Sequence, residues 1–185
     1  MSKKIKELFK KFLELSDSLR NNYSNSLEIN DDEELNGNGI PDVLSPIYSK
    51  VKGTLYEVEN QSLMDFIPGF LLIHKSEYRE FKSKMTKMLS ESKDSYFPFL
   101  VNYSSDFYAL KVENRIDKGV FLINHDELNP IKIHDSFEAF FETIIAFYEK
   151  QVYFLDEDGY LDMDFDKEEE VAQELNPEIP FWFEE

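Results

Sequence analysis

Apolar residues recur at three- and four-residue steps near the start of the chain, which predicts an amphipathic helix from about Ser2 to Asn21. The polar stretch at residues 22–39 is rich in Asn, Asp and Glu and is interpreted as a connector. A second helix is expected to begin at Pro41, which suits a first helical turn, and to end at Gly53. Its buried side would comprise Ile40, Leu44, Ile47, Tyr48 and Val51.

The centre of the chain has the composition of strands, because aromatic and branched residues alternate with clusters of turn-forming residues. This pattern predicts an antiparallel meander, preceded by a short strand and by a helix that Ser76 caps and that continues to about Ser90. The expected strands are residues 70–73, 97–102, 107–112, 119–124 and 130–134, with turns at 102–106 and 113–118.

The last third of the chain predicts a helix, a hairpin and an acidic helix. Asp135 and Glu138 have the spacing of a capping box, and the helix behind them is apolar around more than half of its circumference, so it should be nearly buried against the sheet. Asp158-Gly159 is a strong hairpin signal between strands at 152–155 and 160–165. The alternation from Leu161 to Asp166 predicts a strand with one apolar face and one row of carboxylates, followed by a helix at 167–175.

Charge adds a functional constraint. The formal net charge is −18, and from Asp156 onward thirteen acidic residues accompany a single lysine, Lys167. Such a field repels nucleic acid and anionic lipid and attracts basic surfaces. A row of carboxylates also needs solvent, a cation or a basic partner opposite it. We therefore expect a basic protein partner, although acidity that serves only solubility is the alternative.

The amino-acid composition narrows the classes of protein to which the chain can belong. The chain has no cysteine, which excludes disulfides and thiolate chemistry and fits a reducing cytoplasm. It has neither a continuous apolar signal-peptide core nor a stretch long enough for a membrane span. The aromatic cluster between Tyr96 and Tyr108 lacks the basic surroundings of a nucleic-acid platform and is interpreted as core. The tail at 180–183, with three aromatics, is expected to pack onto its own domain rather than to serve as an exposed anchor.

Candidate chemistry is sparse. Glu34, Asn36, Asn38 and Asp42 partly follow the frame of a calcium loop, but Ser45 stands where a bidentate Glu is expected, so a flexible turn is preferred. The three histidines have no metal-ligand spacing. His125 precedes two acids that could orient an imidazole base, yet no nucleophile or oxyanion loop accompanies it. The sequence predicts no enzyme, no cofactor and no metal site.

The order of several segments resembles the SUKH superfamily, which groups fungal cell-wall-synthesis regulators with many bacterial immunity proteins. The resemblance covers about residues 40–165. It is carried by the segments Ile40–Thr54 (IPDVLSPIYSKVKGT), Ser62–Ile73 (SLMDFIPGFLLI), Tyr96–Tyr108 (YFPFLVNYSSDFY), Gly119–Asp126 (GVFLINHD) and Asp135–Phe137 (DSF). It implies an α+β fold with a central, mainly antiparallel sheet flanked by helices, and a binding module without known catalytic residues. The chain would form a single domain over residues 1–185, with 1–39 as N-terminal helix and connector, 40–165 as core and 166–185 as acidic extension.

The resemblance and the charge together predict a cytoplasmic immunity protein that neutralises a cognate toxin, plausibly a basic nuclease. The alternative is a cytosolic regulator or scaffold of the cell-wall-regulator type that binds a host protein or a small ligand. Neither function involves nucleic acid or a membrane. The residues expected to bind the partner are Asp156, Asp158, Asp162, Asp164 and Asp166, with Tyr103 and Asp106 from the polar turn.

Overall fold

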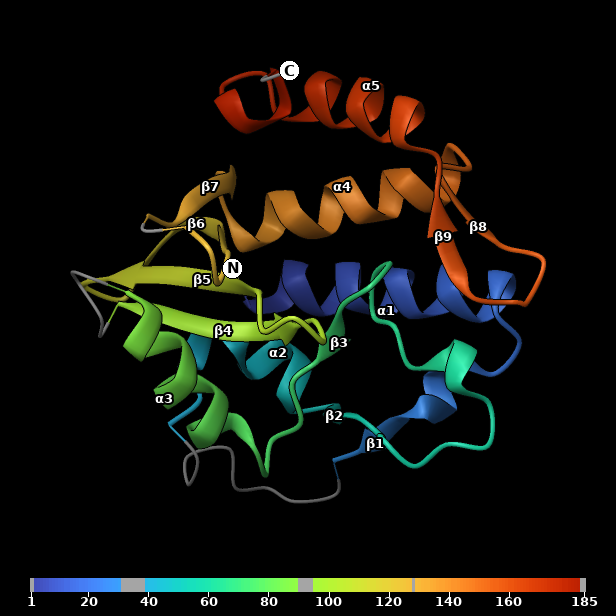
Figure 1. Ribbon diagram of the computed structural model, residues 1–185, viewed down its shortest axis with the longest axis horizontal. Helices are drawn as coiled ribbons and strands as arrows, with labels where there is room; N and C mark the ends of the chain where they lie inside the picture. Colours follow the sequence, from blue (N-terminus) through green and yellow to red (C-terminus); the bar gives the residue numbers. More distant parts are fainter. Residues whose placement is uncertain (1, 31–38, 90–94, 128, 184–185) are drawn as a thin grey trace.

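A central antiparallel sheet flanked by helices forms the molecule, so the expected α+β class is confirmed (Figure 1). The computed structural model describes residues 2–30, 39–89, 95–127 and 129–183. The five strands pair in the order β3-β4-β5-β6-β7, and every pair is antiparallel, as the meander prediction required. The strands are β3 (Leu71–Leu72), β4 (Tyr96–Val101), β5 (Phe107–Glu113), β6 (Ile116–Ile123) and β7 (Ile131–His134).

The loop between β5 and β6 is tighter than predicted. Glu113 pairs directly with Ile116, so only Asn114 and Arg115 connect the strands, where the sequence suggested a turn over 113–118. Both residues have positive φ, 51° and 64°. Two-residue hairpin loops favour this left-handed backbone, because its twist matches that of the strands, and Asn tolerates it well.

The helices cover the sheet and one another. In Figure 1, α4 (Phe137–Glu149) runs between α1 (Ser2–Leu19) and α5 (Phe165–Leu175), and both outer helices contact it. The predicted N-terminal stripe is confirmed, since Phe9 and Phe12 are buried and the Phe12 ring lies 4.4 Å from that of Phe66. The near-complete burial predicted for the apolar residues of α4 is also confirmed. The remaining helix of this size is α3 (Tyr78–Met88).

Two short sheets and several short turns complete the described chain. Strand β1 (Leu27–Ile29) pairs with β2 (Val51–Thr54), and β8 (Tyr153–Leu155) pairs with β9 (Leu161–Met163). The short helical segments are η1 (Tyr23–Ser26), η3 (Asp42–Leu44), α2 (Ser45–Tyr48), η4 (Gln61–Leu63) and η5 (Pro180–Phe183). None of the described helices combines the length and the apolar composition needed to cross a membrane.

The predicted second helix is wrong in its second half. The helical part ends at Tyr48, and Gly53 lies inside β2 rather than at a helix end. A Cβ atom at Gly53 would lie 2.5 Å from the Cα of His74, and the Lys75 N–H donates to the Lys52 carbonyl at 2.6 Å. This close approach of two backbones fixes β2. Its partner β1 occupies part of the predicted connector, because Leu27 is buried opposite Thr54.

Two predicted helix caps also differ from the structure. Ser136, one residue after the predicted Asp135, caps α4 by accepting from the Ala139 N–H at 3.0 Å. Glu138 instead forms an ion pair with Lys4, which ties α1 to α4. Ser76 does not cap α3; its hydroxyl lies 2.7 Å from the Nδ1 of His74. The Glu138 side chain thus has a tertiary partner that a local motif cannot reveal, whereas Ser76 bonds a residue two positions earlier in the chain.

The C-terminal tail packs onto its own domain, as predicted. Trp182 is 9% exposed, and its indole N–H donates to the Ile133 carbonyl at 2.8 Å. This bond anchors η5 to β7 and holds α5 across the outer side of α4.

Candidate functional site

The β8–β9 hairpin carries exposed aromatic and acidic side chains on a fixed turn. The turn is shaped by Asp156, whose Oδ1 accepts from the backbone N–H groups of Asp158 at 3.0 Å and Tyr160 at 2.8 Å. Gly159 has φ 86°, a conformation that glycine adopts without strain. The predicted Asp158-Gly159 hairpin is confirmed, and Asp156 contributes mainly by building the turn.

The hairpin has a buried side and an exposed side. Tyr153 and Leu161 are 4% and 5% exposed, and the Tyr153 ring lies 5.4 Å from that of Phe147 in α4. Phe154 is exposed instead, because successive side chains of a strand point to opposite faces. Figure 1 shows the hairpin projecting from one side of the molecule, beyond the central sheet.

We use the name acidic hairpin surface for six exposed aromatic and acidic residues of this hairpin and of the first turn of α5. Its large apolar members are among the most exposed of the described chain, with Phe165 at 68%. The acids between them lie on the turn, on β9 and at the start of α5. The surface comprises Phe154, Asp158, Tyr160, Asp162, Phe165 and Asp166.

The predicted row of carboxylates on one strand face is wrong. Strand β9 ends at Met163, and Asp164 is the N-cap of α5, where its side chain accepts from the Lys167 N–H at 3.2 Å. The side-chain bond from Lys167 also lowers the pKa of Asp164. Asp166 lies in the first helical turn. Only Asp162 is thus on the strand, and the like-charge repulsion along one strand that the sequence suggested is relieved.

Lysines neutralise little of this C-terminal charge. Among the described residues, the acids from 156 to 178 that form ion pairs with lysine are Asp164, 3.0 Å from Lys167, and Glu174, which pairs with Lys150. Asp158, Asp162 and Asp166 are exposed and have no ion-pair partner in the described chain. The acidic hairpin surface therefore keeps a negative charge.

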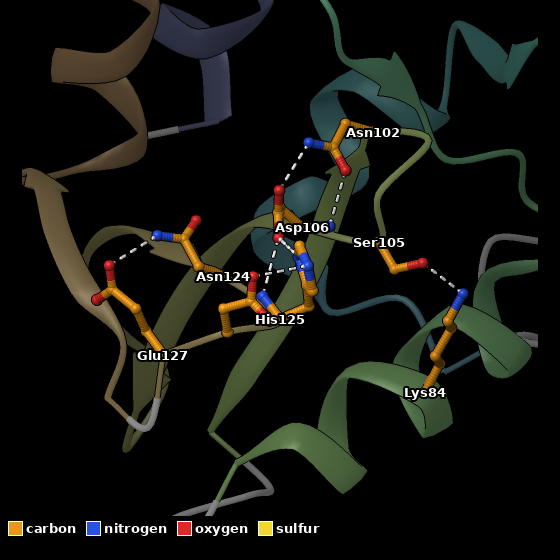
Figure 2. A network of polar contacts seen from close by, with 8 residues as sticks. Lys84, Asn102, Ser105, Asp106, Asn124, His125 and Glu127 are labelled. Atoms are coloured by element: carbon orange, nitrogen blue, oxygen red, sulfur yellow. Dashed lines mark hydrogen bonds and ion pairs between the residues drawn. The ribbon is translucent and has the colours of Figure 1, made fainter.

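Asp106 was also predicted to bind the partner, but its carboxylate already forms hydrogen bonds within its own chain (Figure 2). Its backbone N–H donates to Asn102 Oδ1 and its Oδ2 accepts from Asn102 Nδ2, both at 2.8 Å. Its Oδ1 accepts from the backbone N–H of His125 at 2.8 Å and lies 2.7 Å from the ring Nδ1. Burial raises the pKa of Asp106, but the bonds from His125 and Asn102 outweigh it, and the pKa falls below its usual value.

Tyr103, from the same turn between β4 and β5, is 77% exposed. The turn is braced by Lys84, whose Nζ donates to the Ser105 hydroxyl at 2.6 Å (Figure 2). No hydrogen bond or ion pair within the described ranges joins Tyr103 or Asp106 to the acidic hairpin surface. The residues predicted as one binding set therefore fall into two groups that no hydrogen bond or ion pair of the described residues links. Within the turn, Asp106 is bound by its own chain.

The histidines lie in separate networks. His125 has Nδ1 against Asp106 and Nε2 3.1 Å from Asp126. The bond to Asp106 raises the pKa of His125 and favours its protonated form, which is a poor general base. His74 bonds Glu28 and Ser76, and His134 bonds Asn176. The described residues contain no group of three or more His, Asp or Glu side chains that could hold a metal ion. In the calcium-loop frame, residues 34, 36 and 38 lie outside the described residues.

Sequence reasoning missed a mainly apolar cavity behind the hairpin, whose polar side chains are those of Tyr108, His134, Tyr153, Glu168 and Trp182. The sequence placed Glu168 in an acidic helix at 167–175 and gave it no role. A signal was present, because Glu168 is three and four residues before Val171 and Ala172, which are both buried. These three residues share one helix face, and that face turns inward.

Comparison with known proteins gives no assignment: no protein-family model and no curated protein matches the chain.

Proposed function

We propose that this protein is a non-enzymatic protein-binding module whose acidic hairpin surface holds a basic protein partner. The observation that carries the proposal is the combination of exposed aromatics with carboxylates that no described lysine or arginine neutralises. A surface that only kept the protein in solution would not need Phe154, Tyr160 and Phe165 exposed beside the charges.

The two kinds of side chain have different tasks in binding. Carboxylates accelerate encounter with a positively charged surface, and this effect weakens as salt screens the charges. Aromatic side chains that lose water on contact supply most of the affinity and slow dissociation. The fixed turn around Asp156 lowers the entropy lost on binding, since the hairpin is already ordered.

We further propose that the partner is a toxin domain and that the protein is a bacterial, cytoplasmic immunity protein of the SUKH type. The ordered resemblance over residues 40–165 supports this class, and the negative surface fits a nuclease, whose phosphate-binding face is basic. By covering that face, the acidic hairpin surface would block access of nucleic acid to the toxin.

The test compares two variants with the same loss of charge. In the first, Asp158→Asn, Asp162→Asn and Asp166→Asn neutralise the acidic hairpin surface. In the second, Glu57→Gln, Glu59→Gln and Glu80→Gln neutralise three exposed acids elsewhere. Tagged proteins capture partners from the native host at low salt, and the protein that wild type recovers is purified, titrated against each variant and assayed for toxicity on co-expression.

The proposal predicts that the captured protein is basic, that wild type and the Glu variant bind it and suppress its toxicity, and that the Asp variant binds about tenfold or more weakly at low salt. Equal affinity of the Asp variant at low salt would reject the acidic hairpin surface as the binding site. A captured partner with no toxicity would reject the immunity assignment but leave the binding surface intact.

A further inference from the structure

A cavity of about 50 Å³ lies behind the hairpin, between the central sheet, α4 and α5. A single water molecule needs about 10–15 Å³ of such space, so the cavity can hold a small polar group with part of its chain. Its deep wall is formed by buried residues, among them Phe140, Tyr153 and Trp182.

The mouth of the cavity lies beside the acidic hairpin surface. The lining residues that remain partly exposed are Pro68, Phe70, Tyr108, Met163 and Glu168. Met163 ends β9 and Glu168 belongs to the first part of α5, so the same elements that carry the acidic hairpin surface also border the opening. A group bound at that surface could therefore extend a side chain into the cavity.

The polar atoms of the cavity lining can accept hydrogen bonds from a bound donor group. His134 lies with Nδ1 3.0 Å from Asn176 Oδ1. Because the amide nitrogen of Asn176 donates to Thr143 and Ala172, its Oδ1 must accept, which assigns the proton to His134 Nδ1 and leaves Nε2 as an acceptor. The Glu168 carboxylate accepts only, and the hydroxyls of Tyr108 and Tyr153 can accept.

Among the residues that the structure describes, no lysine or arginine borders these acceptors. Glu168 has no ion-pair partner among the described residues. Burial raises the pKa of Glu168 to about 7, as expected for a carboxyl group removed from water without a compensating charge. Burial also lowers the pKa of His134 to about 4, so this imidazole stays neutral and adds no competing positive charge at neutral pH.

We propose that this cavity binds a primary ammonium group, and that in the complex a lysine side chain of the basic partner supplies it. An ammonium group has three donors and no acceptor, which matches the few polar groups of this mainly apolar lining: one carboxylate, two hydroxyls and an imidazole nitrogen that can accept. The aromatic walls suit its methylene stem and stabilise the charge by cation–π contact. The identification of the donor as a partner lysine rests on the proposed function, whereas ammonium binding itself does not.

Trp182 provides the readout, because it is the only tryptophan of the chain and lines the cavity. Its fluorescence is followed at pH 8 while n-butylamine or Nα-acetyl-lysine methylamide is added, with sodium chloride at matched ionic strength and n-butanol as controls. Both amines stay protonated at this pH. Each titration is repeated with Glu168→Gln and with Glu170→Gln, which removes an exposed charge from the same helix.

Both amines should change the emission of wild type and of Glu170→Gln in a saturable manner, whereas salt and butanol should not. Glu168→Gln should weaken amine binding by about tenfold or more. Absence of a saturable change, or an equal response of Glu168→Gln, would overturn the ammonium site. Binding of butylamine without the lysine derivative would overturn the lysine assignment.

The variant of the acidic hairpin surface separates this inference from the proposed function. Asp158→Asn, Asp162→Asn and Asp166→Asn together should leave amine binding within about twofold of wild type, since none of these residues lines the cavity. Once the partner is purified, Glu168→Gln should weaken its binding about tenfold. If the partner depends on the hairpin acids but not on Glu168, the lysine assignment fails and the proposed function stands.

Discussion

Phe154 and Asp162 pair directly across the β8–β9 hairpin, and both side chains are exposed. A large ring and an unpaired carboxylate thus stand side by side on two neighbouring strands. Directly opposed side chains on one sheet face lie about 4.5–5.5 Å apart at Cβ, close enough to contact a single residue of a partner. An aromatic anchor next to a negative charge fits a basic surface that also has an apolar centre.

This pair predicts that the two residues affect different rates of partner binding, Phe154 the dissociation rate and Asp162 the association rate. Phe154→Ala should mainly raise the dissociation rate, by about tenfold or more, because a ring that loses water on binding is removed. Asp162→Asn should mainly lower the association rate, by about two- to fivefold at low salt, and should make that rate less sensitive to salt. Surface plasmon resonance across salt concentrations measures both rates, with Glu57→Gln as the charge control. Unchanged dissociation from Phe154→Ala would contradict the anchor role.

Buried Arg20 leads to a prediction about stability. Its guanidinium group donates to the Asp65 carbonyl and to the Tyr148 hydroxyl, and lies 3.8 Å from the Tyr23 ring centroid. Arg20→Ala should lower the free energy of unfolding by about 3 kcal/mol, because it leaves a cavity and removes both bonds. Lys6→Ala, on the exposed side of α1, the helix that ends one residue before Arg20, should change it by less than about 0.5 kcal/mol. Urea denaturation measures the difference, and a similar effect of the two variants would contradict the role of Arg20.

Local patterns predicted the elements whose partners are close in sequence. The meander and the β8–β9 hairpin follow from alternation and turn chemistry, and α4 follows from its apolar residues. Strand β1 was missed because Leu27, inside the suggested connector, pairs with Thr54, which lies beyond both the connector and the predicted second helix. Gly53 was assigned to a helix end for the same reason. Glycine is needed at this position because a Cβ atom would clash with the backbone of His74. His74 is too far along the chain to belong to a local pattern around Gly53.

The candidate site was predictable in part. Charge and turn signals located the acidic hairpin, but they could not show that Asp156 and Asp164 serve the backbone of their own turn and helix. Nor could they show that Asp106 is bound by His125, since the two meet only after β5 and β6 pair. Composition gives the number of carboxylates in the chain. Whether a carboxylate is free to bind a partner depends on the hydrogen bonds that it makes within the fold.

The Asp106–His125 pair predicts a dependence of stability on pH. Because the folded pKa of His125 is raised, its contribution is present below its ordinary value of 6.5 and is lost as the pH rises through the folded pKa. The pKa of Asp106 is lowered, so its contribution is present above 3.8 and is lost as the pH falls through the folded pKa. The pair should therefore stabilise the fold most between about pH 4 and 6.5.

His125→Asn tests this dependence, since the variant keeps the backbone N–H that donates to Asp106. Its urea midpoint should lie below that of wild type at pH 5.5, and the difference should shrink by pH 9. Asp126→Asn, which alters a far more exposed neighbour of the same ring, should have a smaller effect. A difference that does not vary with pH would assign the loss to packing rather than to the charged pair.

Glu168 predicts a loss of stability as the pH rises. Burial raises its pKa from an ordinary value of 4.5 to about 7, so between these pH values the unfolded chain loses a proton that the folded chain retains. Stability is therefore full below pH 4.5, falls as the pH rises toward 7 and levels off above it. Since the side chain is partly exposed and solvent screens its charge, the loss should be about 1–2 kcal/mol.

Glu168→Gln should remove this loss, because glutamine stays neutral. Other acids complicate the wild-type curve alone, since Glu28, Asp106 and Asp164 have lowered pKa values and stabilise the fold as the pH rises. The informative quantity is thus the free energy of unfolding of Glu168→Gln minus that of wild type. It should increase by about 1–2 kcal/mol from pH 4.5 to 8, while the same quantity for Glu170→Gln stays nearly constant. A constant difference for Glu168→Gln would show that the folded protein ionises Glu168 at its ordinary pKa, so that the carboxylate of the cavity is as well hydrated as one on the surface.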